Sequence, residues 1–159
     1  MDAQVKKQVL RKLTYGLYVA TAQQGDQAAA ATVNWLSQAS FQPPLVMMAV
    51  KADSGLHGLL TQGATVAVNI LGADQKGLAE AFFRPTKLEG NTLNGVPFKP
   101  GETGAPLLEG VPAAFEAKAV HSYQGGDHTV FVLEVVAVHL NDPEAKVLEM
   151  WDTGWFYGG

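Results

Sequence analysis

The amino-acid sequence predicts a mainly β protein, a closed antiparallel barrel with two or three short helices. Six or seven segments are rich in β-branched and aromatic residues, and tight turns join most of them. Only two or three short segments have the spacing of an amphipathic helix. A doubly wound α/β sheet, the main alternative, needs a helix after nearly every strand and is therefore disfavoured. We expect residues 1–159 to form one domain, because this length suffices for one core.

The expected strands follow from alternation and from runs of apolar residues. Residues 16–23 and 28–35 would form a hairpin around the turn at 25–27. Residues 45–50 (LVMMAV) are continuously apolar after a pair of prolines, which predicts a fully buried strand. The other expected strands are residues 65–71, 113–123, 128–140 and 147–150.

Helices are expected at the N-terminus and between strands. Residues 4–13 have apolar side chains at helical spacing, and a second helix would be capped by Asp53 or Ser54 and end near residue 62. Asp74 is expected to cap a third helix, which ends before Pro85.

Two further segments have no regular pattern. Residues 84–112 are rich in proline and glycine, and a connection of this length inside a domain is usually a functional loop or excursion. Residues 151–157 form an aromatic tail, which we expect to pack on the barrel or into a partner's pocket, because exposed aromatic rings are unfavourable.

Composition excludes several classes of function. The net charge of −4 and scattered basic residues argue against nucleic-acid binding. Without cysteine there is no disulfide, thiolate nucleophile or Cys-ligated metal, and the four histidines form no metal-binding pair. No signal peptide or membrane-length apolar run is evident, so we expect a soluble, cytoplasmic protein that does not engage a membrane. The hydrophobic fraction of 47% indicates burial against a partner, most simply a second copy.

Residues 31–44 (ATVNWLSQASFQPP) are the most informative segment. Hydroxyls, carboxamides and an indole are concentrated there between strand-like segments, a composition that suits the wall of a ligand site. The hydroxyls of Thr32, Ser37 and Ser40 can converge only if the strand ends or bulges near Leu36. An ordinary serine-rich bend is the alternative. Glycine-rich nucleotide fingerprints are absent, so any such ligand would be held by strand ends and hydroxyls.

The order T-x-N-W-x-S-Q-A-S-F-x-P-P, entered from Tyr15-Gly16-Leu17-Tyr18-Val19, resembles the signature of the flavin reductase-like, FMN-binding split-barrel family. It is especially similar to flavoredoxin-type members and to the reductase modules of flavodiiron proteins. Asn69, Phe82-Phe83, Gly126-Asp127-His128 and the aromatic C-terminus extend the resemblance over nearly the whole chain. The resemblance implies an antiparallel, Greek-key split β-barrel.

The resemblance also implies a cofactor site, with FMN, or alternatively FAD, bound near the interface of a homodimer. His128 is the candidate catalytic residue, a polar group at the flavin ring that guides the nicotinamide or donates a proton. The candidate cofactor-binding residues are Thr32, Asn34, Trp35, Ser37, Gln38, Ala39, Ser40, Lys51, Ser54, Asn69, Phe83, Lys87, Asp127 and Trp155. Ser54 and Lys51 are candidate phosphate contacts, although Ser54 also suits a helix cap and Lys87 a solvated loop position.

Three functions remain open at the level of sequence. In the first, NAD(P)H reduces the bound flavin, which passes electrons to free flavin, a ferric complex or a partner protein. In the second, the protein is a non-catalytic, flavoredoxin-like electron carrier. In the third, the barrel has lost its flavin and serves as a sensor or assembly module. The sequence does not distinguish NADH from NADPH.

Overall fold

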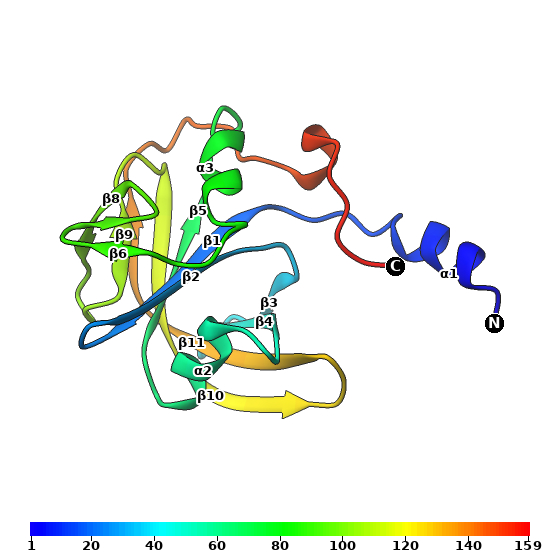
Figure 1. Ribbon diagram of the computed structural model, residues 1–159, viewed down its shortest axis with the longest axis horizontal. Coiled ribbons are helices and arrows are strands. Elements are labelled where there is room, and N and C mark those ends of the chain that lie inside the picture. The colour runs from blue at the N-terminus through cyan, green and yellow to red at the C-terminus, as the bar shows by residue number, and fades with distance from the viewer.

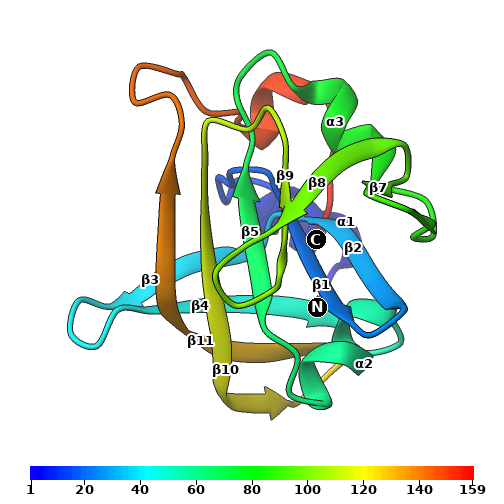
Figure 2. The ribbon, with the colours of Figure 1, turned by 90° about the vertical axis from the view of Figure 1, so that its left-hand side faces the viewer.

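The computed structural model describes residues 1–159, and its main feature is a seven-stranded antiparallel sheet in the order β2-β1-β5-β10-β11-β4-β3. The strands are β1 (Tyr18–Gln24), β2 (Gln27–Val33), β3 (Leu36–Ser40), β4 (Leu45–Lys51), β5 (Val66–Ile70), β10 (Ala113–Gln124) and β11 (His128–Leu140). The sheet wraps around a core (Figures 1 and 2), but β2 and β3 remain unpaired ends of the ladder. The predicted antiparallel barrel is therefore confirmed in its split form.

The curvature of the sheet comes from its two longest strands. The register between β10 and β11 shifts between Glu116 and Ala117 and again between Ala119 and His121. Irregularities of this kind bend a strand pair and increase its twist. Both strands bend visibly in Figure 2, which brings β4 and β3 across the barrel from β5.

Four short strands in residues 84–112 form a second sheet, which the sequence did not predict. They are β6 (Leu88–Glu89), β7 (Thr92–Leu93), β8 (Val96–Pro100) and β9 (Pro106–Leu108), in that order. Strands of two to five residues are too short for a periodic pattern, and glycines with positive φ at Gly90 and Gly95 join the first three. Leu93, Phe98 and Leu108 are buried, so this excursion is a packed part of the fold.

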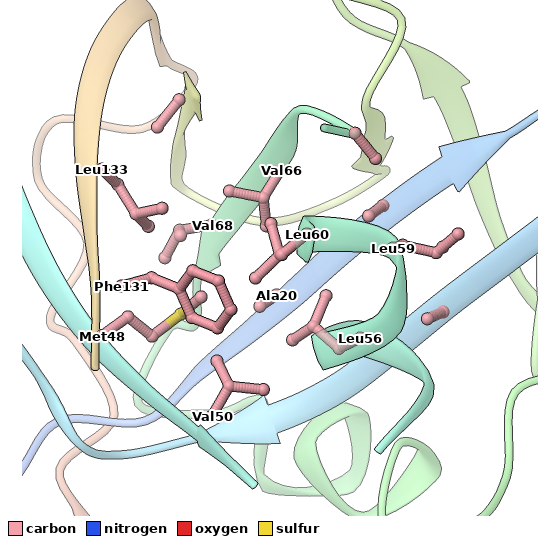
Figure 3. Close-up of a cluster of buried hydrophobic side chains, with 14 of the residues drawn as sticks. Ala20, Met48, Val50, Leu56, Leu59, Leu60, Val66, Val68, Phe131 and Leu133 are labelled. Atoms are coloured by element: carbon pink, nitrogen blue, oxygen red, sulfur yellow. The ribbon is translucent and has the colours of Figure 1, made fainter. Parts of the chain in front are cut away.

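The interior of the barrel holds a cluster of 15 buried residues (Figure 3). Met48 from β4 and Phe131 from β11 face Leu56 and Leu60 of α2 (Gly55–Thr61) across this core. Complete burial of such a side chain contributes about 1.5–3 kcal/mol to folding. The predicted full burial of the strand at 45–50 is wrong, because β4 alternates and its outward Met47 is 43% exposed.

The helices are short, as expected. α1 (Ala3–Leu10) is capped by Asp2, whose carboxylate accepts a hydrogen bond from Val5 N at 2.9 Å, and it projects from the barrel with no buried residue (Figure 1). Ser54 caps α2 as predicted. α3 (Lys76–Ala81) begins after Gln75 and not at an Asp74 cap. No helix has both the length and the apolar character needed to cross a bilayer.

The predicted strand at residues 147–150 is wrong. Only two isolated bridges occur there, Gly16 to Glu149 and Gly72 to Val147, and a 3₁₀ helix, η1 (Met150–Thr153), follows. The tail after η1 then returns across the molecule, so that the C-terminus lies beside α1 (Figure 1).

Candidate active site

A cleft of about 540 Å³ lies where the end of β2, the end of β4, α3 and the C-terminal tail meet. Its wall is mostly apolar, and its volume is within the range of small-molecule sites in proteins. The lining residues are Leu17, Ala31, Thr32, Val33, Asn34, Trp35, Ala49, Val50, Lys51, Ser54, Phe82, Phe83, His128, Met150, Trp155, Phe156 and Tyr157.

The cleft exists because the backbone leaves the sheet after β2. β2 ends at Val33 and β3 begins at Leu36, so Asn34 and Trp35 lie between two strands that belong to opposite ends of the ladder. The predicted interruption near Leu36 is therefore present. Asn34 is buried, and its amide nitrogen lies 3.5 Å from the carbonyl oxygen of Tyr157. The interruption thus places polar side chains on the wall and also binds the tail.

Trp35 provides a flat surface and an unpaired hydrogen-bond donor. Its ring centroid lies 4.5 Å from that of His128 and 5.2 Å from that of Tyr157. The indole nitrogen Nε1 is buried without an acceptor. An unpaired buried donor costs about 1–3 kcal/mol. A planar ligand, such as an isoalloxazine ring, fits the flat aromatic side chains that line the cleft.

His128 is held between two hydrogen-bond partners. Its Nδ1 lies 2.8 Å from Asp127 Oδ1, and its Nε2 lies 2.7 Å from the Tyr157 hydroxyl. The hydrogen bond from His128 and its electrostatic attraction lower the pKa of Asp127. Burial, together with the negative charges of Asp127 and Asp53, raises the pKa of Tyr157. The phenol therefore stays protonated at neutral pH and can serve as a donor.

The predicted anion contacts, Lys51 and Ser54, line the rim of the cleft. Lys51 is exposed, and its Nζ lies 3.9 Å from Asp53 Oδ1. The hydroxyl of Ser54 accepts a hydrogen bond from His57 N and thus caps α2. Both residues stand where a phosphate at the rim could reach them, and their role in holding one stays a prediction.

Two predicted aromatic residues also contact each other in the lining of the cleft. Phe83, which follows α3, and Trp155 of the tail pack edge to face with ring centroids 4.8 Å apart. Thr32 also lines the cleft, and its hydroxyl donates to the carbonyl oxygen of Ala79 at 2.6 Å. Of the predicted residues, the structure therefore gathers Thr32, Asn34, Trp35, Lys51, Ser54, Phe83, His128 and Trp155 around one cleft.

The second half of the signature lies elsewhere. Ser37, Gln38 and Ala39 are exposed and Ser40 is partly exposed on the edge strand β3, and none of them lines the cleft. Pairing with β4 carries this segment away from Thr32, so the predicted convergence of hydroxyls does not occur within one chain. The prediction that these four residues contact the cofactor is not supported by the geometry of the single chain.

Three other predicted residues have different surroundings. Asn69 is completely buried, donates to Val19 O and Thr21 Oγ1 and accepts from Leu108 N, so its side chain joins strands and cannot reach a cofactor. Lys87 lies outside the cleft with its Nζ 3.6 Å from Glu89 Oε1. Asp127 reaches the cleft only through His128.

Sequence reasoning missed two important residues of the cleft, Phe156 and Tyr157. The aromatic composition of the tail was visible, and the expectation that it packs on the barrel is met within the chain. No local pattern indicates which of its rings meets His128, because 29 residues separate Tyr157 from that partner.

The fold and the cleft together define a class, namely a split barrel with a mostly apolar, aromatic-lined cleft between strand ends. The family model of the flavin reductase like domain matches residues 10–158. The chain therefore belongs to the flavin reductase-like family, and the resemblance noted in the sequence is confirmed.

Characterised relatives include reductases and larger flavoproteins. The chain is 36% identical over 114 residues to the NADH-dependent FAD reductase of Streptomyces globisporus, covering 70% of this chain and 63% of the relative. It is 29% identical over 130 residues to FMN reductase (NADH) SmoA of Agrobacterium fabrum, covering 82% and 72%. It is 34% identical over 125 residues to a protein named as diflavin flavoprotein A 3 of Synechocystis sp., covering 78% and 21%. The chain thus spans only about a fifth to a quarter of the diflavin flavoproteins that it matches.

A solved structure supports the same assignment. The NADH:FAD oxidoreductase of Streptomyces globisporus C-1027, in complex with NAD and FAD fragments, superposes with a TM-score of 0.77 at 30% identity. The match covers 91% of this chain and 86% of that one. The fold of this chain is therefore that of a flavin reductase.

Proposed function

We propose that this protein is a flavin reductase that uses a reduced nicotinamide to reduce a flavin held in the cleft. The cleft carries the proposal, because the ring of Trp35 and the hydrogen-bonded His128 line one mostly apolar space. Family membership and the names of the reductase relatives support it. When bound, the flavin accepts a hydride from the nicotinamide and passes electrons to an acceptor.

The chain's own residues supply binding and position in this proposal. Trp35 would pack its ring against the ring of the ligand. Lys51 and Ser54 at the rim would address the phosphate. His128, fixed by its neighbours, would orient the nicotinamide or supply a proton.

FMN is the flavin that we favour, because residues 31–44 resemble the signature of the FMN-binding family. FAD is the alternative, since both flavins occur in the names of the relatives. The same names favour NADH as the donor. The acceptor is free flavin, a ferric complex or a partner flavoprotein, and the match to part of the diflavin flavoproteins supports the last of these. That match also favours a second function, a flavin electron carrier within a larger redox system.

We also propose that the protein acts as a homodimer. Four apolar residues of α1 and the turn after it are exposed, Val5 by 54%, Val9 by 60%, Leu10 by 41% and Leu13 by 55%. A helix of 8 residues is marginal on its own, so a second copy that covers this face would stabilise it. Arg11 lies over the Phe156 ring, 4.8 Å from its centroid, which links this face to the cleft through the tail.

Anaerobic titration tests the proposed reductase. The protein saturated with FMN should bleach on addition of NADH, and free FMN or a ferric chelate should then restore the colour. Bleaching by dithionite but not by NADH or NADPH would favour the electron carrier. Failure to bind either FMN or FAD would refute both functions.

Sedimentation of the protein at micromolar concentration tests the proposed dimer. The variant Val9→Asp, which places a charge on the exposed apolar face of α1, is expected to sediment as a monomer.

A further inference from the structure

The hydroxyl of Tyr157 is the second hydrogen-bond partner of His128, a contact that the sequence resemblance did not assign. The distance from Tyr157 Oη to His128 Nε2 is 2.7 Å, and the two rings meet edge to face with centroids 5.8 Å apart. The His128 side chain is 13% exposed, whereas Tyr157 is 46% exposed. His128 is therefore the most shielded member of the hydrogen-bonded group Asp127–His128–Tyr157, and both of its partners are more exposed than it is.

The two partners of His128 determine where its hydrogens lie. The carboxylate of Asp127 can only accept, so Nδ1 of the imidazole carries a hydrogen. In the neutral ring Nε2 is then the acceptor, and it accepts from the Tyr157 hydroxyl. Burial and nearby negative charge raise the pKa of Tyr157, so this donor keeps its proton at neutral pH. Both ring nitrogens are thus engaged within the protein.

Several contacts hold Tyr157 in this place. Its ring packs against Trp35, and its backbone oxygen lies 3.5 Å from the Asn34 amide nitrogen. The next residue, Gly158, lies against the Trp35 ring and has a φ of 130°, a backbone conformation that favours glycine. Arg11 Nε lies 3.4 Å from the Gly158 oxygen. The position of the phenol is therefore set by the fold.

We propose that Tyr157 is a positioning residue for the reductase reaction, holding the His128 ring in one orientation with Nδ1 protonated. This inference rests on the proposed function, because it assigns Tyr157 a role only if His128 serves the flavin or the nicotinamide. By holding the imidazole, the phenol sets the orientation in which the His128 ring meets the nicotinamide. Its loss would affect turnover more than flavin binding, since the ring that packs on Trp35 is retained in phenylalanine.

The first experiment is ¹⁵N NMR of the imidazole nitrogens in flavin-free protein labelled at histidine, with His128→Asn to assign the signals. In the wild type, neutral His128 should show a protonated Nδ1 and an unprotonated, hydrogen-bonded Nε2. Tyr157→Phe should shift the Nε2 signal, whereas Tyr123→Phe, the same change at a residue 72% exposed, should not. An unchanged Nε2 signal in Tyr157→Phe would overturn the proposal.

The second experiment measures reduction of FMN by NADH. Tyr157→Phe should lower kcat by roughly 3- to 10-fold, the value of one hydrogen bond, with little change in the FMN dissociation constant. Tyr123→Phe should match the wild type. An altered NMR signal with unchanged kcat would overturn the positioning role and leave the proposed function intact. A wild type that binds no flavin would instead refute the proposed function, whatever the NMR shows.

Discussion

The molecule contains two pairs of a carboxylate and a histidine, and they differ in how completely their polar atoms are satisfied. Asp127 and His128 lie at the cleft with 2.8 Å between Oδ1 and Nδ1. Glu116 and His139 lie on β10 and β11, with 2.7 Å between Oε2 and Nε2. The Glu116 side chain is completely buried, whereas that of Asp127 is 92% exposed.

The Glu116 pair stabilises the fold. Its carboxylate accepts from His139 Nε2, from the backbone N–H groups of Glu102 and Thr103 and from the Thr103 hydroxyl. It thereby fixes the turn between β8 and β9 against the barrel, and a Cβ at Gly101 would collide with the carboxylate. The four donors occupy all the lone-pair directions of the carboxylate, so Glu116 has no capacity left for a ligand.

The Asp127 pair is open in comparison. Asp127 has one side-chain partner, and the hydrogen-bonded chain ends at the accessible hydroxyl of Tyr157 beside the unpaired Trp35 N–H. The difference indicates that saturated polar clusters hold the excursion in place, whereas incompletely satisfied ones are available for chemistry. The following predictions test this distinction.

The largest effect is expected for Glu116→Ala. Loss of the carboxylate leaves the donors of Thr103, Glu102 and His139 without their partner and should lower the free energy of unfolding by about 3 kcal/mol. Urea denaturation at pH 7 measures this. The control is Glu102→Gln, which changes an exposed side chain but keeps the backbone N–H. Equal midpoints for the two variants would contradict the structural role of Glu116.

Trp35→Ala should weaken FMN binding by roughly 10-fold, because the ligand loses the flat aromatic surface against which it packs. Fluorescence titration with FMN measures the dissociation constant. Trp151→Ala is the matched control, since Trp151 is 52% exposed and does not line the cleft. If both variants bind FMN equally, the ligand does not occupy this cleft.

Acid should destabilise the protein partly through Glu116. Burial alone would raise the pKa of Glu116, but the hydrogen bonds from Thr103, His139 and the backbone outweigh it, so the net pKa is lowered. This stabilisation is present above the pKa of an unfolded glutamate, about 4.3, and is lost as the pH falls through the lower folded-state value. Unfolding midpoints in this window should fall more steeply for the wild type than for Glu116→Gln, and parallel slopes would exclude Glu116 as the cause.

The smallest effects are expected at the open pair and on β3. Asp127→Asn should leave the unfolding midpoint unchanged and lower the rate of FMN reduction, which separates reactivity from stability.

Ser37→Ala combined with Ser40→Ala should leave FMN affinity within about 2-fold of the wild type, because neither residue lines the cleft of the single chain. A marked loss of affinity in the double variant would show that β3 reaches the flavin from a second subunit.

Much of the fold was predictable because it is local. Alternation, apolar runs and turn signals identified six of the seven barrel strands, and Ser54, one of two expected caps, caps its helix. The excursion was not predictable, because its strands are short and owe their order to burial of Leu93 and Phe98 against the core. The strand expected at 147–150 failed because only single bridges to Gly16 and Gly72 are available there.

The candidate site was also predictable only in part. Thr32, Asn34 and Trp35 were identified because an interrupted strand with dense polar groups is a local pattern. The exposure of Ser37 was not predictable, since it depends on pairing with β4.

The sequence by itself determined six strands of the barrel, a break near Leu36 and the family, because periodicity and motifs reside in neighbouring residues. Only the tertiary structure decided that Tyr157 meets His128, that Asn69 is a buried tie between strands and that Glu116 is saturated. These contacts join residues that are distant in the chain, and long-range packing, which no local pattern encodes, brings them together.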